Sequence, residues 1–103
     1  DGLLEYHGRM DRQIKHMGHR VELDEIEAAA MQSENVRECV GLYHEAKEVL
    51  YLFYSGDKEK RDLILDLRKI LPGFMIPRKV IGLDMLPKLP NGKMDMEKLK
   101  ERM

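Results

Sequence analysis

The chain has 103 residues, of which 43% are hydrophobic and 36% are charged, and its 18 basic and 19 acidic residues give a formal net charge of −1. This length predicts one domain with a modest core. The balanced charge argues against a general nucleic-acid binder, which carries a net basic face. No apolar run approaches the ~20 residues of a membrane span, and no signal peptide opens the chain, so we expect no membrane partner.

The cysteine content bears on the cellular compartment, and the first residue bears on how much of the protein the sequence covers. The single cysteine, Cys39, permits no internal disulfide, which favours a reducing, cytoplasmic compartment. The first residue is Asp1 rather than methionine, so we expect the sequence to be a piece of a longer protein.

The first predicted element is a two-stranded ribbon. Partial alternation over residues 13–17 and 20–23 indicates two strands, and the glycine between them suits a tight turn. Asp24 is the expected N-cap of the helix that follows, with Glu27 three residues later as in a capping box. We expect this helix to end near Asn35.

The middle of the chain predicts an antiparallel hairpin and an amphipathic helix. Residues 36–43 and 49–54 are rich in β-favouring side chains and predict the two strands of the hairpin. Residues 55–57 are expected to break the second strand and to cap a helix that ends at Pro72. The apolar stripe of that helix consists of Leu63, Ile64, Leu67, Ile70 and Leu71.

The last third predicts one more strand and a short helix. Pro77 favours extended geometry before it, so residues 74–76 are expected to cross the surface as a strap. Residues 79–83 predict a third strand, Pro90 to Gly92 a turn, and Asp95 the cap of a final helix. The sum is an α+β fold: a small three-stranded sheet with packed helices plus a two-stranded ribbon at the N-terminal side.

Three stretches occur in an order that is found in one known superfamily. They are GRMDRQIKHMGHRVELDEIE at residues 8–27, LPGFMIP at 71–77 and LPNGKMD at 89–95. Together they resemble the C-terminal small lobe of adenylate-forming enzymes, which include acyl-CoA synthetases, non-ribosomal peptide synthetase adenylation domains and luciferases. The resemblance implies that residues 1–11 are the hinge segment from a large lobe and that residues 12–103 are the small lobe.

The resemblance also implies an activity. Such enzymes use ATP and Mg²⁺, bound mainly by the large lobe, to form an acyl- or aminoacyl-adenylate, and then pass the acyl group to a thiol of phosphopantetheine or CoA. The implied partners are the large lobe of the same polypeptide and a carrier protein or CoA. The sequence of residues 18–23 resembles that of amino-acid-activating members more than that of acyl-CoA synthetases. A small lobe by itself is expected to be inactive.

Lys93 is the catalytic residue that the resemblance implies. In the family, the lysine of the Asn-Gly-Lys loop bridges the substrate carboxylate and the α-phosphate region during adenylation. A compact ammonium between two anions lowers the cost of bringing them together. Without the family, Asn91 and Gly92 would be an ordinary hairpin turn and Lys93 its solvated flank.

Asp11 matches the position about which the small lobe swings between adenylation and thioester formation. Aspartate adopts unusual backbone angles more readily than bulky residues do, which suits a hinge. Arg9 and Lys15 lie near it in sequence and would bind nucleotide phosphate or ribose, although a solvated role for Lys15 is an open alternative. From composition alone, Asp11 is one acid in a polar ribbon.

Gly18, His19 and Arg20 resemble the turn that faces the active site after the swing. Gly18 and His19 would line the tunnel for the pantetheine arm, because a glycine lets the arm pass close to the backbone. Arg20 would bind the adenylate phosphate. A plain tight turn at Gly18 is compatible with this role.

The remaining candidates carry less chemistry. The histidines and acids form no convincing metal site, and Cys39 is expected to be a packing residue. Met17 and Met96 stand where amino-acid-activating members usually have basic residues. The rival hypothesis is a stand-alone binding or regulatory module that keeps the fold without catalysis.

Overall fold

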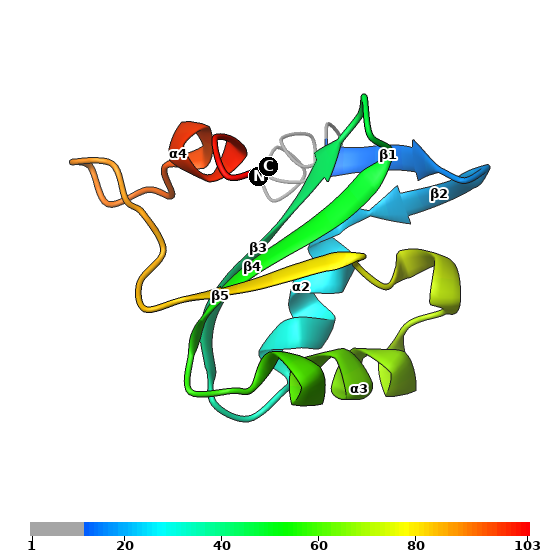
Figure 1. Cartoon of the computed structure of the whole chain (residues 1–103), viewed down its shortest axis with the longest axis horizontal. Helices are drawn as coiled ribbons and strands as arrows, with labels where there is room; N and C mark the ends of the chain where they lie inside the picture. The colour runs from blue at the N-terminus through cyan, green and yellow to red at the C-terminus, as the bar shows by residue number, and fades with distance from the viewer. Residues whose placement is uncertain (1–11) are drawn as a thin grey trace, which may run out of the picture.

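The computed structural model describes residues 12–103, and Figure 1 shows their arrangement. The elements in chain order are β1 (Gln13–His16), β2 (His19–Glu22), α2 (Leu23–Met31), β3 (Val36–His44), β4 (Val49–Gly56), α3 (Lys60–Ile70), the 3-10 helix η2 (Gly73–Met75), β5 (Lys79–Leu83) and α4 (Met96–Lys100). β1 and β2 form an antiparallel ribbon, and β3, β4 and β5 form a sheet in that order. The predicted α+β fold with its ribbon is confirmed.

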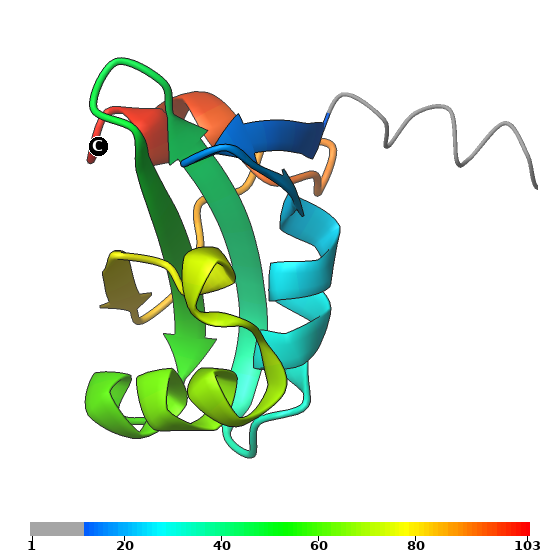
Figure 2. The same cartoon turned by 90° about the vertical axis from the view of Figure 1, so that its right-hand side faces the viewer.

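Strand β4 lies at the centre of the larger sheet. It is antiparallel to β3, as the hairpin prediction requires, and parallel to β5. A parallel neighbour needs a crossover connection, and α3 provides it, packed on one face of the sheet together with α2 (Figure 2). Because both of its faces are covered, β4 is a nearly continuous buried run, as expected of a central strand.

Alternate residues of β4 enter two separate apolar clusters on the opposite faces of the sheet. Leu50, Leu52 and Tyr54 belong to the cluster beneath α2 and α3. Val49, Tyr51 and Phe53 belong to a second cluster, which also contains the buried Leu86 and Leu99 from the segment after β5. The second cluster therefore fastens the C-terminal part of the chain to the sheet.

Helix α2 does not begin as predicted. Its N-cap is Glu22, whose side chain makes no capping hydrogen bond. Asp24 and Glu27 do not form a capping box, because the Arg12 guanidinium donates hydrogen bonds to both carboxylates. A long-range ion pair therefore replaces the local cap.

The same helix ends earlier than predicted, at Met31 rather than near Asn35. Asn35 has a φ of 68°, in the left-handed region that breaks a helix. Ser33 lies beyond the helix, and its hydroxyl donates to Asp66 on α3. Asp66 also pairs with Lys58 at 2.8 Å, so this loop is fastened to α3.

Helix α3 starts later than predicted. Residues 55 and 56 remain in β4, and Glu59 is the N-cap, without a side-chain capping bond. The strand continues because Ser55 pairs with both neighbouring strands, β3 and β5. The predicted apolar stripe is confirmed at Leu63 and Leu67, which are fully buried, whereas Ile70 is 47% exposed.

Residues 74–76 are not the predicted extended strap. Gly73–Met75 forms the 3-10 helix η2, closed by a hydrogen bond from the Ile76 amide to the Gly73 carbonyl. Pro77 restricts only the residue before it, and Ile76 is indeed extended, at φ −74° and ψ 124°. The proline therefore limits one residue and leaves room for the helical turn.

Among the described glycines, Gly56 is the one at which an added side chain would come closest to other backbone atoms. Its φ is 124°, and an added Cβ would lie 2.8 Å from the Arg37 amide nitrogen and closer still to the Asn35 carbonyl oxygen. We expect Gly56→Ala to lower the free energy of unfolding by about 2 kcal/mol, since both contacts involve backbone that cannot move aside. Urea denaturation would measure this effect, with Gly73→Ala as the control, because Gly73 has open space around its Cβ position.

Candidate functional site

Lys93 lies at a tight turn that backbone hydrogen bonds close. The amide of Gly92 donates to the Leu89 carbonyl at 2.8 Å, and the amide of Leu89 donates to the Lys93 carbonyl at 2.7 Å. The Asn91 side-chain oxygen accepts from the Lys93 amide at 3.0 Å. Gly92 has a φ of 89°, which favours glycine. The predicted turn is confirmed, and the Lys93 ammonium is exposed, with no partner among residues 12–103.

This lysine turn, residues 89–93, is anchored on both sides. Lys88 and Met94 form an isolated antiparallel bridge across its base. Farther out, Leu86 and Leu99 are 2% and 0% exposed in the second apolar cluster. The Asp95 carboxylate caps α4, as predicted. The turn is therefore a projection held at its base.

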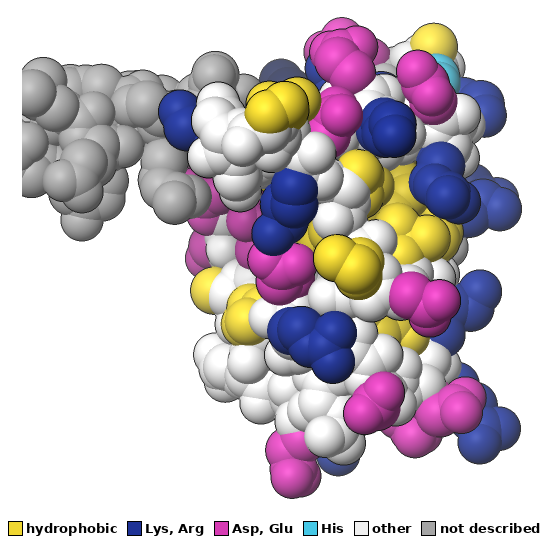
Figure 3. Space-filling model, turned by 90° about the vertical axis from the view of Figure 1, so that its left-hand side faces the viewer, with side chains coloured by type: hydrophobic (Ala, Val, Ile, Leu, Met, Phe, Trp, Pro, Cys, Tyr) yellow, Lys and Arg dark blue, Asp and Glu magenta, His cyan; other side chains and the backbone are white. Residues whose placement is uncertain are grey.

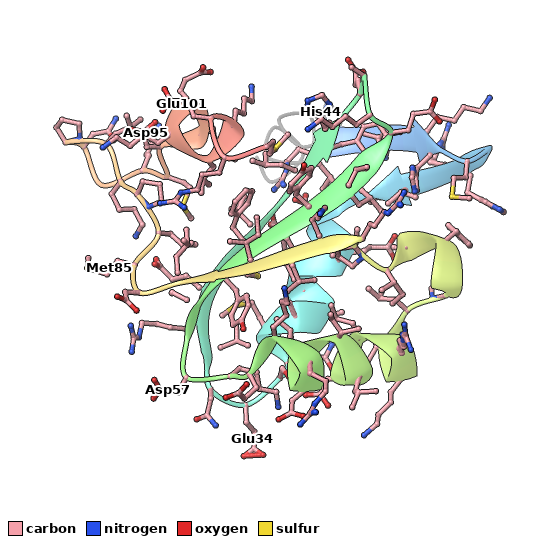
Figure 4. The ribbon with its side chains drawn as sticks, in the orientation of Figure 1. Glu34, His44, Asp57, Met85, Asp95 and Glu101 are labelled. Atoms are coloured by element: carbon pink, nitrogen blue, oxygen red, sulfur yellow. The ribbon has the colours of Figure 1, made fainter. Side chains whose placement is uncertain are left out.

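An open groove of about 640 Å³ lies beside the lysine turn. Figure 3 shows this end of the molecule, where apolar side chains lie among basic and acidic ones. Met85 is the most exposed large apolar residue described, at 77%, and Figure 4 shows it on the same side as Asp95. The groove is lined by Leu83, Met85, Leu86, Pro87, Lys88, Lys98, Glu101 and Arg102.

The turn of the β1–β2 ribbon is built from Met17 and Gly18. Their φ values are 53° and 82°, so both residues lie in the left-handed region, as in the two-residue turns that suit a twisted hairpin. Such a turn favours Asn or Gly, and methionine at its first position is strained. Met17 is 71% exposed, and a Cβ at Gly18 would meet open space. The predicted tight turn is confirmed.

The register of the ribbon gives it an outer and an inner face. Lys15 pairs with Arg20 across the strands, and both are exposed. Like charges directly opposite one another are destabilising, so this outer face is suited to an anion that lies between the two cations. The structure thus brings together Lys15 and Arg20, which the sequence assigned separately to nucleotide binding.

The inner face of the ribbon carries both of its histidines. Cross-strand partners share a face, and His16 pairs with His19. His16 is buried, and its Nδ1 lies 3.3 Å from the Tyr43 hydroxyl. The His19 ring stacks on Phe74 of η2, with centroids 4.0 Å apart and planes inclined by 14°. Sequence reasoning placed His19 in a tunnel and missed its stacking partner.

Arg12 fixes the start of the described chain to two other elements. Its guanidinium donates to both carboxylate oxygens of Glu27, at 2.6 and 3.1 Å, and to Asp24 Oδ1 at 2.8 Å. It also donates to the carbonyl of Gly41 in β3 at 2.7 Å. Glu27 in turn accepts from the Gly41 amide at 2.7 Å. This Arg12 network was missed, and two acids at helical spacing on α2 were its only local signal.

Two of the predicted site residues, Arg9 and Asp11, lie outside the described residues. Their assignments to nucleotide binding and to the hinge stay predictions. The structure does describe the residue that follows Asp11. This residue, Arg12, is held against α2 and β3 by its hydrogen-bond network.

Cys39 is unsuited to act as a nucleophile at neutral pH. Burial, and secondarily the Glu27 carboxylate, raise the pKa of the thiol to about 12, against a small lowering by Arg12. The Cys39 Sγ also contacts the Glu27 carbonyl oxygen at 3.5 Å. A thiol with this pKa is almost entirely protonated at pH 7, which agrees with the packing role that the sequence predicts.

Two negative observations apply to the described part of the chain. Between residues 12 and 103, no three His, Cys, Asp or Glu side chains are grouped so that they could hold a metal ion. Over the same range, no helix has the length and apolar character needed to cross a bilayer.

The lysine turn and the ribbon turn lie at opposite ends of the molecule. In Figure 1 the segment between β5 and α4 reaches the left edge and the β1–β2 turn reaches the right edge, and in Figure 2 the ribbon is in front and that segment behind. The described residues span 37 × 36 × 30 Å. The structure therefore does not combine Lys93 and the ribbon into a single site.

The chain is similar to parts of large peptide synthetases. Gramicidin S synthase 2 of Brevibacillus brevis is 42% identical over 108 residues, which cover 98% of this chain and 2% of that protein. Tyrocidine synthase 3 of Brevibacillus parabrevis is 38% identical over 104 residues, covering 96% of this chain and 2% of that protein. The chain thus spans only a small part of these relatives.

Solved structures and a family model agree with these matches. Klebsiella oxytoca NpsA, in complex with 3-hydroxyanthranilyl-AMSN, superposes with a TM-score of 0.80 at 28% identity, over 89% of this chain and 19% of that one. A Mycobacterium tuberculosis fatty acyl CoA synthetase gives 0.76 at 25% identity, over 91% of this chain and 20% of that one. The family model for the AMP-binding enzyme C-terminal domain matches residues 25–93. The chain therefore belongs to the AMP-binding enzyme C-terminal domain family, the small lobe of the adenylate-forming superfamily.

Proposed function

We propose that the chain is the mobile C-terminal lobe of an ATP-dependent ligase that activates a carboxylate and transfers the acyl group to a pantetheine thiol. In the first step a carboxylate oxygen attacks the α-phosphorus of ATP, and the bond to pyrophosphate breaks. In the second step the thiol sulfur attacks the acyl carbon, the bond to AMP breaks, and the thiol proton passes to water. Family membership and the synthetase relatives support this proposal.

The observation that carries the proposal is the separation of the two turns. One rigid lobe bears at one end a lysine that has no partner within the described residues 12–103, and at the other end a cationic ribbon. A single substrate site can meet both only if the lobe rotates between the two steps. Rotation of a lobe about a few residues is an established means of presenting different groups to one site.

In the adenylation step, the role of Lys93 is electrostatic. Charge accumulates on the α-phosphate oxygens as the carboxylate approaches, and an ammonium already fixed in place stabilises both anions without reorganisation. The anchored base of the lysine turn provides that fixed position. The groove around Met85 would then lie against the large lobe, whose residues would hold ATP and Mg²⁺.

In the thioester step, the ribbon replaces the lysine turn. Lys15 and Arg20 form the exposed cationic pair that would bind the adenylate phosphate. Gly18 has open space where a side chain would be, so the arm of phosphopantetheine or CoA can pass close to the backbone. Arg9 would add a further cation on the nucleotide side.

The hinge is assigned to Asp11 and the boundary of the moving lobe to Arg12. The Arg12 network ties that residue to α2 and β3 by hydrogen bonds that are partly shielded from water. Residues 12–103 therefore move as one body, and the dihedral changes fall on residues 1–11. In such a swing a few hinge residues absorb the change in φ and ψ.

Two finer assignments complete the proposal. The substrate is an amino acid rather than a fatty acid, since the curated relatives reported above are peptide synthetases, and the acceptor is the arm of a carrier protein in the cytoplasm. The rival function is a binding module without catalysis. The anchored turn exposes a Lys93 ammonium that has no partner in the part of the chain that the structure describes. This favours the ligase, because a binding scaffold has no need for such a group.

The test uses the chain by itself and within the longer polypeptide that the proposal requires. We expect residues 1–103 alone to fold but to give no ATP–pyrophosphate exchange, because the large lobe supplies the phosphate and acyl pockets. The longer polypeptide should exchange pyrophosphate with a suitable amino acid. If the isolated chain exchanges pyrophosphate above a Lys93→Ala control, the claim that the large lobe supplies the phosphate and acyl pockets is refuted. If the longer polypeptide is inactive, the binding module is favoured.

A further inference from the structure

The ribbon turn is held in a strained shape by contacts outside the ribbon. Met17 has a φ of 53°, a conformation that a methionine adopts at a cost in free energy. The ribbon itself offers little support against that strain, because a two-stranded hairpin is only marginally stable by itself. Contacts with other elements must therefore fix the turn.

Two aromatic contacts provide this support, one on each strand. The His16 ring meets Tyr43 edge-on, with centroids 5.4 Å apart and planes at 75°, and the His19 ring stacks on Phe74. The edge-to-face geometry of His16 and Tyr43 is one that aromatic pairs favour, and the His19 and Phe74 rings are in direct face contact. Tyr43 comes from β3 and Phe74 from η2, so the two strands are tied to different parts of the lobe.

The stack also determines which way His19 faces. His19 shares the inner face of the ribbon with His16, whereas Lys15 and Arg20 share the outer face. One side of the His19 ring is covered by Phe74 at 4.0 Å. The Met17 side chain and the Gly18 backbone are exposed at the tip of the turn, whereas the His19 ring, although the residue is exposed, already has Phe74 against one of its faces.

We propose that His19 and Phe74 are a positioning pair, which holds the Met17–Gly18 turn in place for thioester formation, and that His19 itself does not touch the arm. The proposal rests on the proposed function, and it replaces the direct tunnel-lining role that the sequence suggested for His19. Phe74 thereby acquires a role in thiol transfer, although it lies in a different motif and makes no contact with the arm.

The first part of the test is independent of activity and uses the chain of residues 1–103. In wild type, the ring current of Phe74 should displace the NMR resonances of the His19 ring protons from their ordinary positions. Phe74→Leu should remove this displacement and Phe74→Tyr should keep it. Ile76→Val is the matched control, because Ile76 is a half-buried neighbour packed on the same cluster.

The second part measures both half-reactions in the longer polypeptide. We expect Phe74→Leu and His19→Ala to lower kcat/KM for thiol loading about tenfold, as misplacement of a positioning group does, while pyrophosphate exchange changes less than about twofold. Phe74→Tyr and His19→Phe should restore loading, since each keeps a stacked pair of rings. His19 is exposed, so its variants carry the test if Phe74→Leu does not fold.

Each contrary outcome has a separate meaning. If His19→Phe keeps the stack by NMR but loads as poorly as His19→Ala, the imidazole touches the arm and the positioning pair is refuted. If Phe74→Leu loses the ring-current displacement but loads normally, the stack is only structural and the inference fails. If even Gly18→Leu leaves loading unchanged, the ribbon does not meet the arm and the proposed function itself is wrong.

Discussion

Replacing Lys93 by alanine is expected to lower adenylate formation by about 10²–10³-fold, or about 2.7–4 kcal/mol, which is the range for loss of a preorganised charge stabiliser. The reason is that the substitution removes an exposed ammonium that has no partner among residues 12–103 and is therefore available to the reacting anions. Pyrophosphate exchange in the longer polypeptide measures this step.

The same variant should largely spare the thioester step. When acyl-adenylate is supplied ready-made, the proposal has the lobe work from its ribbon end, whereas the segment between β5 and α4, which contains Lys93, lies at the other end. Lys69→Ala is the matched control, because Lys69 is an exposed lysine on α3, away from both turns. Equal losses in both half-reactions would mean that Lys93 is not specific to the adenylation orientation.

Asp11→Pro is expected to separate the two half-reactions in the opposite sense. Proline fixes φ near −65°, so a hinge that needs two backbone conformations would keep one of them. Because the Arg12 network already holds the next residue to the lobe, the restriction cannot be relieved on that side. We expect adenylation to be retained and most thiol transfer to be lost.

The experiment measures pyrophosphate exchange and thiol loading on one preparation. Asp11→Asn is the control, because asparagine keeps the size and the tolerance for unusual backbone angles. Gly18→Leu should give a similar split for a different reason, since its side chain would fill the open space at the turn. If Asp11→Pro leaves both rates within about twofold, a change of only ~0.4 kcal/mol in the barrier, the hinge lies elsewhere.

The sequence could predict those elements whose signals are local. The alternation about Gly18, the apolar run of β4 and the Asn-Gly turn before Lys93 each lie within a few residues, and each appears in the structure. The cap at Asp95 was predicted for the same reason, because its partner is the amide three residues later.

The misplaced elements depend on contacts that are distant in sequence. Asp24 looks like a helix cap, but its carboxylate is bound by Arg12, which is twelve residues earlier in sequence and lies at the same open end of the ribbon. Ser55 looks like a strand breaker, but β3 and β5 both pair with it. That β5 runs parallel to β4 follows from the crossover through α3 and has no local signal.

The residues of the candidate site divide in the same way, although their roles stay predictions. Lys93 and the cations of the ribbon follow from motifs, whereas the Arg12 network and the His19–Phe74 stack join residues from separate motifs. No periodicity connects such pairs in a single sequence. They are the contacts that hold the motifs in position.

The anchoring of the lysine turn has a consequence for attempts to exchange parts between relatives. The turn takes its position from Leu86 and Leu99, and these two side chains pack against Phe53 and its neighbours on the second face of the sheet. A graft of residues 89–93 alone would transfer the lysine without Leu86 and Leu99, which fix its position. The transferable unit is the whole segment from 84 to 103, together with the sheet residues beneath it, so swapped loops should function only when donor and recipient fill that face with side chains of matching shape.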